Sequence, residues 1–425
     1  MKIEIPLLAM LQHLIKPEYY LQFLHDLHEA ALVRLKEKLG RGEKIRIATV
    51  AVSIQEYIGD EICRLFMADS RFEFMAITCK QTNCEAEELY KLQEHLDKVG
   101  IPSRFADGTI LPSDFDILLY QSPYWFQLEN FGNDLVPPET LVCYAAYGFC
   151  TSNAHNLIWN TEFHKSCWKN FIYNKADFAV GKVHSDIGDY GYTYTGYPKL
   201  DPLLEPEKIA PLGRFKIAGG RDYTKVQKII YAPHHSINEI PWQSTFPQNY
   251  EFMLDYAKKH PEKSFIFKPH GLLKASTVKN GIFRSEAEFD AYAAEWDRLP
   301  NGKYVQFEYL PYFVNSDCMV MDCISFITEY FYVNKPLLYL TREKLNLNEY
   351  GQLAIKQHYT MPGDNHKGIA DWLENEALTD PHKGKRTALF EALLDYYGET
   401  GRTAAQNMYH AIADEFNDVK KKLQL

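Results

Sequence analysis

The sequence predicts two α/β domains in tandem, each built on a doubly wound parallel sheet, with helical additions at both ends. Three observations support this fold class. The chain has 425 residues, which is more than one hydrophobic core usually serves. From residue 45 onward, short and continuously apolar runs alternate with amphipathic segments, a pattern typical of parallel strands covered on both faces. The segment 201–225 is rich in Pro, Gly and charge and interrupts the alternation midway.

The first half of the chain begins with a predicted helix over residues 7–38, because leucines recur there at spacings of three and four. We expect it to pack on the protein's own core or on a partner subunit. Its nearly balanced charges make an anionic membrane surface the less favoured alternative. The remaining elements of this half are strands at 44–52, 72–79, 115–121, 140–148 and 192–198, with helices at 54–68 and 85–100.

The second half repeats this rhythm after the linker. We expect strands at 226–232, 263–268, 303–308, 318–322 and 336–340, and helices at 248–260, 285–297, 310–316, 325–334 and from about 366 to the end. The predicted domains are therefore a helical extension, an amino-terminal Rossmann-like domain, a carboxyl-terminal Rossmann-like domain and closing helices, at 1–43, 44–205, 206–365 and 366–425. Two such sheets would face each other across a cleft, with ligands at the carboxyl ends of the strands.

Charge and cysteine usage narrow the class of protein. The formal net charge is −10 and the pI about 5.9, so nothing favours nucleic acid as a partner. The eight cysteines are scattered and form no Cys-x-x-Cys pair, which indicates reduced thiols in a cytoplasmic protein. Neither a secretion signal nor an apolar run of membrane-spanning length is present in the sequence. Peripheral contact with the inner face of the cell membrane remains open.

Three strands of the second half end in polar residues. The run "IIYAPHHSI" leads through Pro233 into His234 and His235, and "FIFKPHG" leads through Lys268 into His270. An imidazole at such a place suits a hydrogen bond to phosphate or the transfer of a proton. Since neighbouring side chains of an extended chain point in opposite directions, we expect only one of the two adjacent histidines to face a ligand. The alternative for each histidine is an ordinary turn residue.

The third strand end is "DCISFITEY", where Asp322 closes a strand and Ser325 opens a helix. The free amides at a helix start attract phosphate oxygens. Glu329 follows one turn later on the same side and suits a ribose hydroxyl. The competing interpretation makes Ser325 a simple helix cap and Glu329 a solvated residue.

The sequence offers no convincing metal site. The one Asp-x-Asp, Asp114 to Asp116, precedes its strand and so lies at the wrong edge of the sheet. We therefore expect no metal and no cofactor, with diphosphate charge met by helix amides, His270 and a base such as Lys268 or Arg342. A Walker loop and a Gly-rich dinucleotide fingerprint are also lacking in the sequence, which disfavours nucleoside triphosphatases and dehydrogenases.

Four segments together resemble the CDP-glycerol glycerophosphotransferase family: "TGYPKLD" (195–201), "IIYAPHHS" (229–236), "FIFKPHG" (265–271) and "NSDCMVMDCISFITEYFYVNKPLLYL" (315–340). The resemblance covers about 145 residues, mostly the half that binds the donor in that family. It implies a GT-B scaffold of two facing Rossmann-like domains. The positions that match the family pattern are Pro198, Asp201, Pro233, Lys268, His270, Ser316, Asp317, Asp322, Ser325, Glu329 and Pro336.

The sequence departs from the family at two points. A Trp-His-Gly turn, whose histidine is implicated as the base, is replaced by Ala146-Tyr147-Gly148. Tyr147 is a weak base at neutral pH, and His155 or His164 are the alternatives. The residues after Tyr-Ala-Pro are His234, His235 and Ser236 in place of the usual threonine and basic residues, so the donor itself is open.

The resemblance implies a metal-independent transferase that moves an alditol phosphate from a CDP-activated donor to a hydroxyl of a cell-surface glycan or glycolipid and releases CMP. The predicted site consists of His270, Tyr147 and His155 as catalytic residues and Pro233, His234, His235, Lys268, Asp322, Ser325 and Glu329 as donor-binding residues. A GT-B glycosyltransferase, a sugar-nucleotide 2-epimerase and a catalytically silent nucleotide-binding subunit are the alternatives, and an oligomer remains open.

Overall fold

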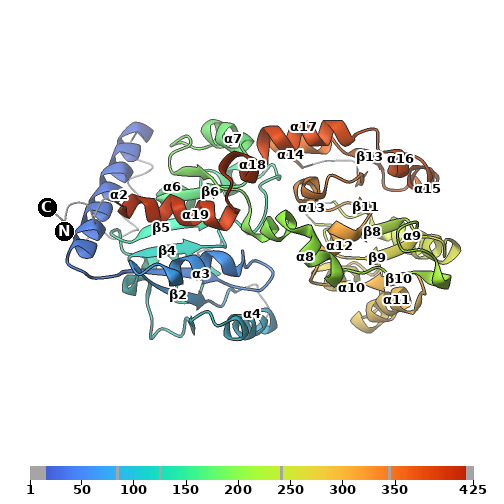
Figure 1. Ribbon diagram of the computed structural model, residues 1–425, viewed down its shortest axis with the longest axis horizontal. Coiled ribbons are helices and arrows are strands. Elements are labelled where there is room, and N and C mark those ends of the chain that lie inside the picture. The colour runs from blue at the N-terminus through green and yellow to red at the C-terminus, as the bar shows by residue number, and fades with distance from the viewer. Residues whose placement is uncertain (1–15, 83–85, 124–126, 240–242, 343–345, 418–425) are drawn as a thin grey trace. The chain divides into compact units, whose positions relative to one another are not determined.

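The chain divides into two compact units in a computed structural model that describes residues 16–82, 86–123, 127–239, 243–342 and 346–417 (Figure 1). Unit 1 comprises residues up to 150, 154–201 and those from 393 onward, and unit 2 comprises 151–153 and 202–392. The crossing point at 201/202 falls inside the predicted linker. That linker folds into short helical turns: η4 Pro198–Leu204, α8 Pro206–Ile209, η5 Ala210–Leu212 and η6 Ala218–Gly220.

Unit 1 contains a seven-stranded sheet in the order β3-β2-β1-β4-β5-β6-β7, and all of its neighbouring strands are parallel. This confirms the predicted doubly wound sheet. The strands are β1 Ile45–Ala51, β2 Phe72–Thr78, β3 Ser103–Phe105, β4 Ile117–Tyr120, β5 Leu141–Ala145, β6 Lys169–Ile172 and β7 Tyr192–Tyr194. The helices are α2 Pro17–Gly40, α3 Asp60–Ala68, α4 Ala86–Val99, α5 His155–Ile158, α6 Glu162–Ser166, α7 Ala176–His184, α18 Tyr396–Thr400 and α19 Ala404–Ala413.

The helix predicted at 54–68 starts only at Asp60, so this prediction is wrong over its first turn and a half. Gly59 has φ +125°, a conformation that ends any helix running into it. The preceding residues form a loop held by side chains, since Ser53 Oγ accepts the backbone N–H of Glu56 at 3.2 Å and Gln121 Oε1 accepts that of Ile58 at 3.1 Å.

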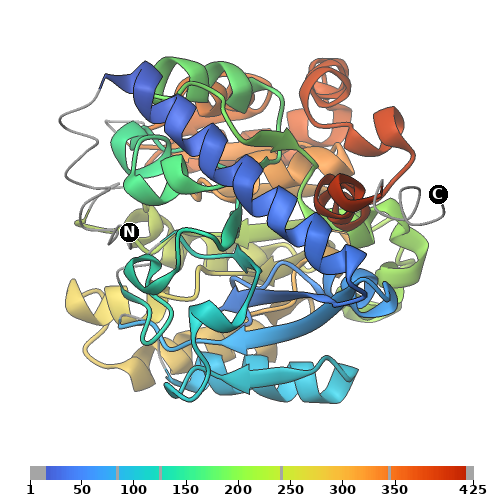
Figure 2. The ribbon, with the colours of Figure 1, turned by 90° about the vertical axis from the view of Figure 1, so that its left-hand side faces the viewer.

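Helix α2 packs on unit 1 itself, as expected for the described part of the predicted helix 7–38. Residues 1–15, and with them the first leucines of the pattern, lie outside the described residues. Leu24 is buried beside Ile187, and Asp116 receives Arg34 Nη1 at 3.3 Å and Lys38 Nζ at 2.5 Å. Figure 2, in which unit 1 faces the viewer, shows α2 as a blue helix running diagonally across the unit.

The segment "TGYPKLD" secures the carboxyl-terminal helices to unit 1. The Asp201 carboxylate accepts hydrogen bonds from Tyr396 Oη at 2.7 Å and from the backbone N–H groups of Ala404 and Ala405 at 2.8 and 3.0 Å. Gly196 has φ +80°, and a Cβ there would lie 2.1 Å from the Tyr396 ring. Helix α19 thus lies next to α3, although it is the last α-helix of the described chain (Figure 1).

Unit 2 contains a six-stranded parallel sheet in the order β10-β9-β8-β11-β12-β13. Its strands are β8 Lys228–Ala232, β9 Ser264–Phe267, β10 Gly302–Tyr304, β11 Cys318–Met321, β12 Leu337–Thr341 and β13 Tyr359–Pro362. Its helices are α9 Phe246–Lys259, α10 Leu273–Lys279, α11 Glu286–Arg298, α12 Leu310–Asn315, α13 Phe326–Glu329, α14 Glu349–Ile355, α15 His366–Glu374, α16 Glu376–Thr379 and α17 Lys383–Leu393. The predicted helix 325–334 is α13 followed by a 3-10 turn, η7 Tyr330–Val333.

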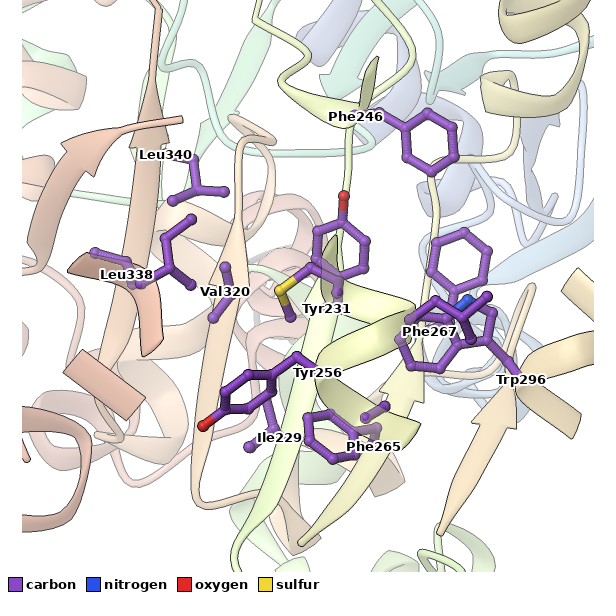
Figure 3. Close-up of a cluster of buried hydrophobic side chains, with 14 of the residues drawn as sticks. Ile229, Tyr231, Phe246, Tyr256, Phe265, Phe267, Trp296, Val320, Leu338 and Leu340 are labelled. Carbon is purple, nitrogen blue, oxygen red and sulfur yellow. The ribbon is translucent and has the colours of Figure 1, made fainter. Parts of the chain in front are cut away.

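The core of unit 2 is strongly aromatic. Phe246, Phe267 and Trp296 pack together with at most 1% exposure, and the Phe267 and Trp296 rings stack at 5.4 Å between centroids (Figure 3). Aromatic pairs of this kind add to the free energy gained from burying apolar area. The core therefore fixes β8 and β9, whose carboxyl ends carry the histidines.

The described residues show the state of the cysteines and the membrane-spanning capacity of the helices. The seven cysteines in that part of the chain are free, and all but Cys150 are buried. Among the helices described, none combines the length and the apolar character needed to cross a bilayer.

Candidate functional site

Unit 2 brings the three predicted polar strand ends to one place. β8 lies between β9 and β11, so His234 and His235 after β8, His270 after β9 and Asp322 after β11 share the carboxyl edge of the sheet. The strand order reverses direction between β8 and β11. Open α/β sheets bind ligands outside the carboxyl ends of the strands at such a switch point.

The three histidines form one cluster. Ring centroids lie 4.3 Å apart for His234 and His235, 4.9 Å for His234 and His270, and 4.4 Å for His235 and His270. Both adjacent rings lie beside His270, so the expected alternation of their side chains does not hold, and which of them faces a ligand stays a prediction. The chain leaves the extended conformation after β8, and the N–H of Ile237 donates to the carbonyl of His235 at 2.8 Å, so the alternation of side chains no longer applies.

Hydrogen bonds assign the tautomer of two of these imidazoles. The backbone N–H of Ser236 donates to His234 Nδ1 at 3.2 Å, and that of Leu272 donates to His270 Nδ1 at 3.1 Å. A ring nitrogen that accepts a hydrogen bond carries no proton, so in the neutral ring the proton resides on Nε2. Ser236 Oγ also lies 2.8 Å from His234 Nδ1 and can donate its hydroxyl proton to that nitrogen. We therefore infer that His234 and His270 each present an Nε2–H donor.

His235 has the opposite arrangement. Its Nδ1 lies 3.4 Å from Glu239 Oε1, and Glu239 in turn pairs with Lys279 at 2.8 Å. A carboxylate facing Nδ1 favours the proton on that nitrogen and leaves a lone pair on Nε2. The cluster therefore combines two N–H donors and one acceptor.

The surroundings of all three imidazoles lower their pKa, which favours the neutral form at pH 7. Burial, reinforced by the neighbouring His235 and Lys268, lowers the pKa of His270 to about 3. Burial also lowers the pKa of His234 well below its usual range, and that of His235, where Glu239 acts in the opposite direction. A neutral imidazole can donate its N–H to an anion without carrying a positive charge itself.

Asp322 positions the cluster from within the protein. Its carboxylate is buried and accepts the backbone N–H of His234 at 2.5 Å, the Thr245 hydroxyl at 2.8 Å and the Thr245 backbone N–H. Burial raises the pKa of Asp322 to about 7 against these hydrogen bonds. The oxygens of Asp322 accept hydrogen bonds from protein groups, so this residue connects β11 to the loop after β8. The contact of Asp322 with the donor stays a prediction.

The other predicted donor-binding residues surround this edge. Ser325 stands at the N-cap position of α13 and accepts no capping bond there, and Glu329 is buried in the same short helix. Lys268 is buried, with Nζ 5.8 and 5.9 Å from the ring centroids of Tyr309 and Phe326. Pro233 lies between β8 and the histidines and is likewise buried. Arg342 Nη1 donates to the carbonyls of Ile237 and Ser244 in the loop after β8.

The three histidines also satisfy the spacing of a metal site, with one ring nitrogen of each within 4.8 Å of the others. Their hydrogen bonds do not fit that use. A neutral imidazole that binds a metal through Nε2 carries its proton on Nδ1, whereas Nδ1 of His234 and of His270 accepts a backbone N–H. The donor set fits an anion better, and the expectation of a metal-free site stays a prediction.

In unit 1 the three predicted proton acceptors lie in different surroundings. Tyr147 follows β5, and its carbonyl accepts Tyr197 Oη at 2.5 Å. His155 begins α5 and stacks on His184 with 3.5 Å between ring centroids. His164 is buried, which lowers its pKa to about 3, and its Nδ1 lies 2.5 Å from Thr161 Oγ1. None of these geometries tests the role of base, which stays a prediction for each.

The sequence assigned no role in the site to Glu239, Ser236 or Leu272. Glu239 follows His235 by four residues, a spacing that could have suggested the pair. Ser236 and Leu272 donate their backbone N–H groups to the imidazoles. Every residue except proline has such a group, so the residue type does not reveal this role.

The fold has counterparts among solved structures. A Staphylococcus aureus MnaA–UDP structure superposes with a TM-score of 0.56 at 11% identity, covering 88% of this chain and 97% of that one. A Neisseria meningitidis UDP-GlcNAc 2-epimerase with UDP-GlcNAc gives 0.53 at 13%, covering 87% and 99%. The wall teichoic acid polymerase TagF gives 0.55 at 10%, covering 90% of each chain. No protein-family model and no curated protein sequence matches the chain.

These similarities establish the fold class and nothing finer at such low identity. The chain has two Rossmann-like units with parallel sheets of seven and six strands, as in GT-B enzymes. The predicted fold class is confirmed.

Proposed function

We propose that this protein is a CDP-alditol phosphotransferase, which moves a glycerol phosphate or another alditol phosphate to a hydroxyl of a cell-surface glycan or glycolipid and releases CMP. The observation that carries the proposal is the pair of neutral Nε2–H donors, His234 and His270, at the switch point of the unit 2 sheet. The sequence resemblance to CDP-glycerol glycerophosphotransferases supports the same class of donor, and the likeness to the wall teichoic acid polymerase TagF supports a scaffold suited to it.

The diphosphate of the donor would accept hydrogen bonds from these two N–H groups. An acceptor hydroxyl attacks the phosphorus distal to the cytidine, a new P–O bond forms, and the bond to the bridging oxygen breaks with its electron pair left on CMP. The hydroxyl proton passes to a base, the role predicted for Tyr147, His155 or His164. Negative charge grows on the bridging oxygen as that bond breaks. Fixed donors already aimed at this charge stabilise the transition state without reorganisation, and this is the role we assign to His270.

His235 supplies the complementary group. Its Nε2 lone pair can accept a hydrogen bond from a donor hydroxyl, while Glu239 holds the ring orientation from the other side. An alditol carries such hydroxyls next to its phosphate. The cluster can thus bind both the charged and the neutral parts of the transferred group.

A second candidate is a sugar-nucleotide 2-epimerase or another enzyme acting on a UDP-sugar. It is favoured by one specific observation: the epimerase and MnaA–UDP structures superpose on this chain as well as TagF does. The same N–H donors would then bind the diphosphate of a uridine nucleotide, and no alditol would be transferred.

Product analysis separates the two candidates. The protein is incubated with CDP-glycerol, CDP-ribitol or UDP-GlcNAc, with and without a glycolipid acceptor, and the nucleotides and sugars are resolved by chromatography. We expect CMP from a CDP-alditol, lost in His270→Asn and retained in the control His366→Asn, whose imidazole stacks on Phe252 and contacts the carbonyl of Gln248. Conversion of UDP-GlcNAc to its 2-epimer, with no CDP-alditol bound or consumed, would overturn the proposal.

A further inference from the structure

Unit 2 contains a large pocket beside β13, the edge strand of its sheet (Figure 1). Its volume is about 780 Å³, within the range of roughly 300–1,000 Å³ in which ligand pockets fall. Every residue of its wall lies between Leu338 and His382, so the pocket belongs wholly to unit 2. β13 is three strands away from β8 in the sheet, about 14 Å at the usual spacing of neighbouring strands. The pocket is therefore separate from the histidine cluster.

One part of the wall is aromatic. The rings of Tyr359 and His382 stack with 4.3 Å between centroids, and the Trp372 ring meets the Tyr359 ring edge-on at 5.4 Å. Tyr359 and His382 are both partly exposed, so the stack is open to solvent. Tyr359 Oη donates to Asp380 Oδ1 at 3.3 Å and accepts the backbone N–H of His382 at 3.2 Å. These hydrogen bonds hold the stack as a flat apolar surface.

The other part of the wall consists of polar side chains that a ligand can reach, because all four are exposed: Gln352, Lys356, Thr360 and Glu376. Lys356 and Glu376 form no ion pair within the part of the chain that the structure describes. Gln352 Nε2 donates to the carbonyl of Leu347 at 3.1 Å, which leaves Gln352 Oε1 to accept a hydrogen bond. The pocket thus offers accessible donors and acceptors beside an aromatic surface.

The charges of the wall narrow the class of ligand. The wall carries one cation, Lys356, and one anion, Glu376. A bound phosphate or carboxylate would be repelled by Glu376, and a bound ammonium by Lys356. An aliphatic chain would cover polar side chains without giving them hydrogen-bond partners. A hydroxyl group can donate to Glu376 and accept from Lys356, so the wall favours an uncharged ligand with many hydroxyl groups.

We propose that this pocket is a saccharide-binding site for a neutral oligosaccharide. The apolar C–H face of a sugar ring lies against the stack of Tyr359 and His382. The hydroxyl groups at the edge of the ring bind Lys356, Glu376 and Gln352. For an enzyme that acts on a glycan, a second point of attachment raises the effective concentration of the chain at the reacting site. This inference goes beyond the proposed function and holds for any nucleotide that the histidine cluster binds.

The fold keeps the pocket in shape. Asn348 caps α14, since its Oδ1 accepts the backbone N–H of Gly351 at 2.8 Å. On the opposite side, the backbone N–H of Arg386 donates to the carbonyl of His382 at 3.2 Å, and the Arg386 guanidinium pairs with Asp380. β13 between them is held by its parallel pairing with β12. The groups that would bind the sugar are therefore positioned before it arrives.

The test uses the indole N–H of Trp372, which lines the pocket, as a reporter. The full-length protein is labelled with ¹⁵N-tryptophan, and the Trp372 signal is assigned by its loss in Trp372→Phe. Cellotriose, maltotriose and chitotriose are titrated as neutral probes. Trigalacturonic acid and triglucosamine serve as charged comparators, and a polyethylene glycol of similar length lacks the hydroxyl groups. Trp296, buried in the core of unit 2 and not part of the wall, provides an internal control signal.

We expect a saturable shift of the Trp372 signal with at least one neutral trisaccharide and no matching shift of Trp296. Lys356→Ala and Glu376→Ala should each need about fivefold more saccharide for saturation, because a hydrogen bond to a charged group is lost. Both residues are exposed, so the two variants should fold. The matched controls Lys259→Ala and Glu391→Ala, which remove exposed charges outside the pocket wall, should leave the titration unaltered.

Four results would overturn the proposal: no saturable shift with any of the three trisaccharides, an equal shift with polyethylene glycol, tighter binding of a charged trimer, or unchanged saturation in both Lys356→Ala and Glu376→Ala. The experiment contains no nucleotide, so its outcome is separate from that of the proposed function. A protein that binds a trisaccharide here yet consumes no CDP-alditol would keep this site and lose the phosphotransferase assignment.

Discussion

Asp177 carries a stability cost that can be measured. Burial raises its pKa from 3.8 to about 8 in the folded protein. The unfolded chain releases the proton near pH 4, while the folded protein retains it until about pH 8. Folding stability therefore falls as the pH rises between these values, and Asp177→Asn, which cannot ionise, should escape the loss.

The magnitude follows from the shift. Each pKa unit corresponds to about 1.4 kcal/mol, so a shift from 3.8 to about 8 gives about 5 kcal/mol at pH 8 and a ceiling of about 6 kcal/mol above it. At pH 5 the same shift gives only about 1.5 kcal/mol. Asp177 lines a small cavity in unit 1. The other titratable side chains that line it are Tyr144, Cys150, His164, Tyr173 and Tyr192. His164 stays neutral throughout this window, because burial lowers its pKa to about 3.

The assay is urea unfolding of the wild type, Asp177→Asn and the control Asp189→Asn at pH 5 and pH 8, followed by tryptophan fluorescence and analysed by linear extrapolation. We expect Asp177→Asn to be the more stable protein, by a margin that grows with pH. A gain of equal size at both pH values, or a loss at pH 8, would refute the reasoning. Stability given up for an unpaired buried carboxyl is a common feature of functional sites.

Three further predictions concern the fold and the histidine cluster. Gly196→Ala should destabilise the protein by more than about 2 kcal/mol, since φ is +80° and the new Cβ meets the Tyr396 ring; urea unfolding measures this, and an unchanged midpoint would contradict it. Asp322→Ala should lower the free energy of unfolding by about 2–4 kcal/mol, because it leaves buried N–H groups unpaired. A decrease below about 0.5 kcal/mol in the same assay would contradict this cause. Glu239→Gln should lower the pKa of His235 further, because the carboxylate now raises it; an NMR titration of the imidazole reports the direction, and an upward shift would exclude the contact.

The sequence predicts the parallel sheets well because their strands are continuous apolar runs. β8, β9, β11 and β12 each begin and end within two residues of the prediction. β6, with Lys169 and Asn170 in a run of four residues, and β13, which is half exposed, were missed. Short strands that mix polar and apolar residues take their conformation from pairing with neighbours, and one sequence does not record that pairing.

The candidate site also combines features that the sequence shows with features that require coordinates. His234, His235 and His270 were predicted because imidazoles after strands are visible in the sequence. Their tautomers depend on the backbone N–H groups of Ser236 and Leu272, which require coordinates.

The most direct test is an NMR experiment on ¹⁵N-histidine-labelled protein at pH 7, with His234 and His270 assigned by single substitution. We predict neutral rings protonated at Nε2, and a change of both Nε2–H signals when CDP-glycerol is added, larger than the change with UDP-GlcNAc. Rings protonated at Nδ1, or signals that ignore CDP-glycerol while responding to UDP-GlcNAc, would contradict the assignment of these imidazoles to a cytidine diphosphate donor.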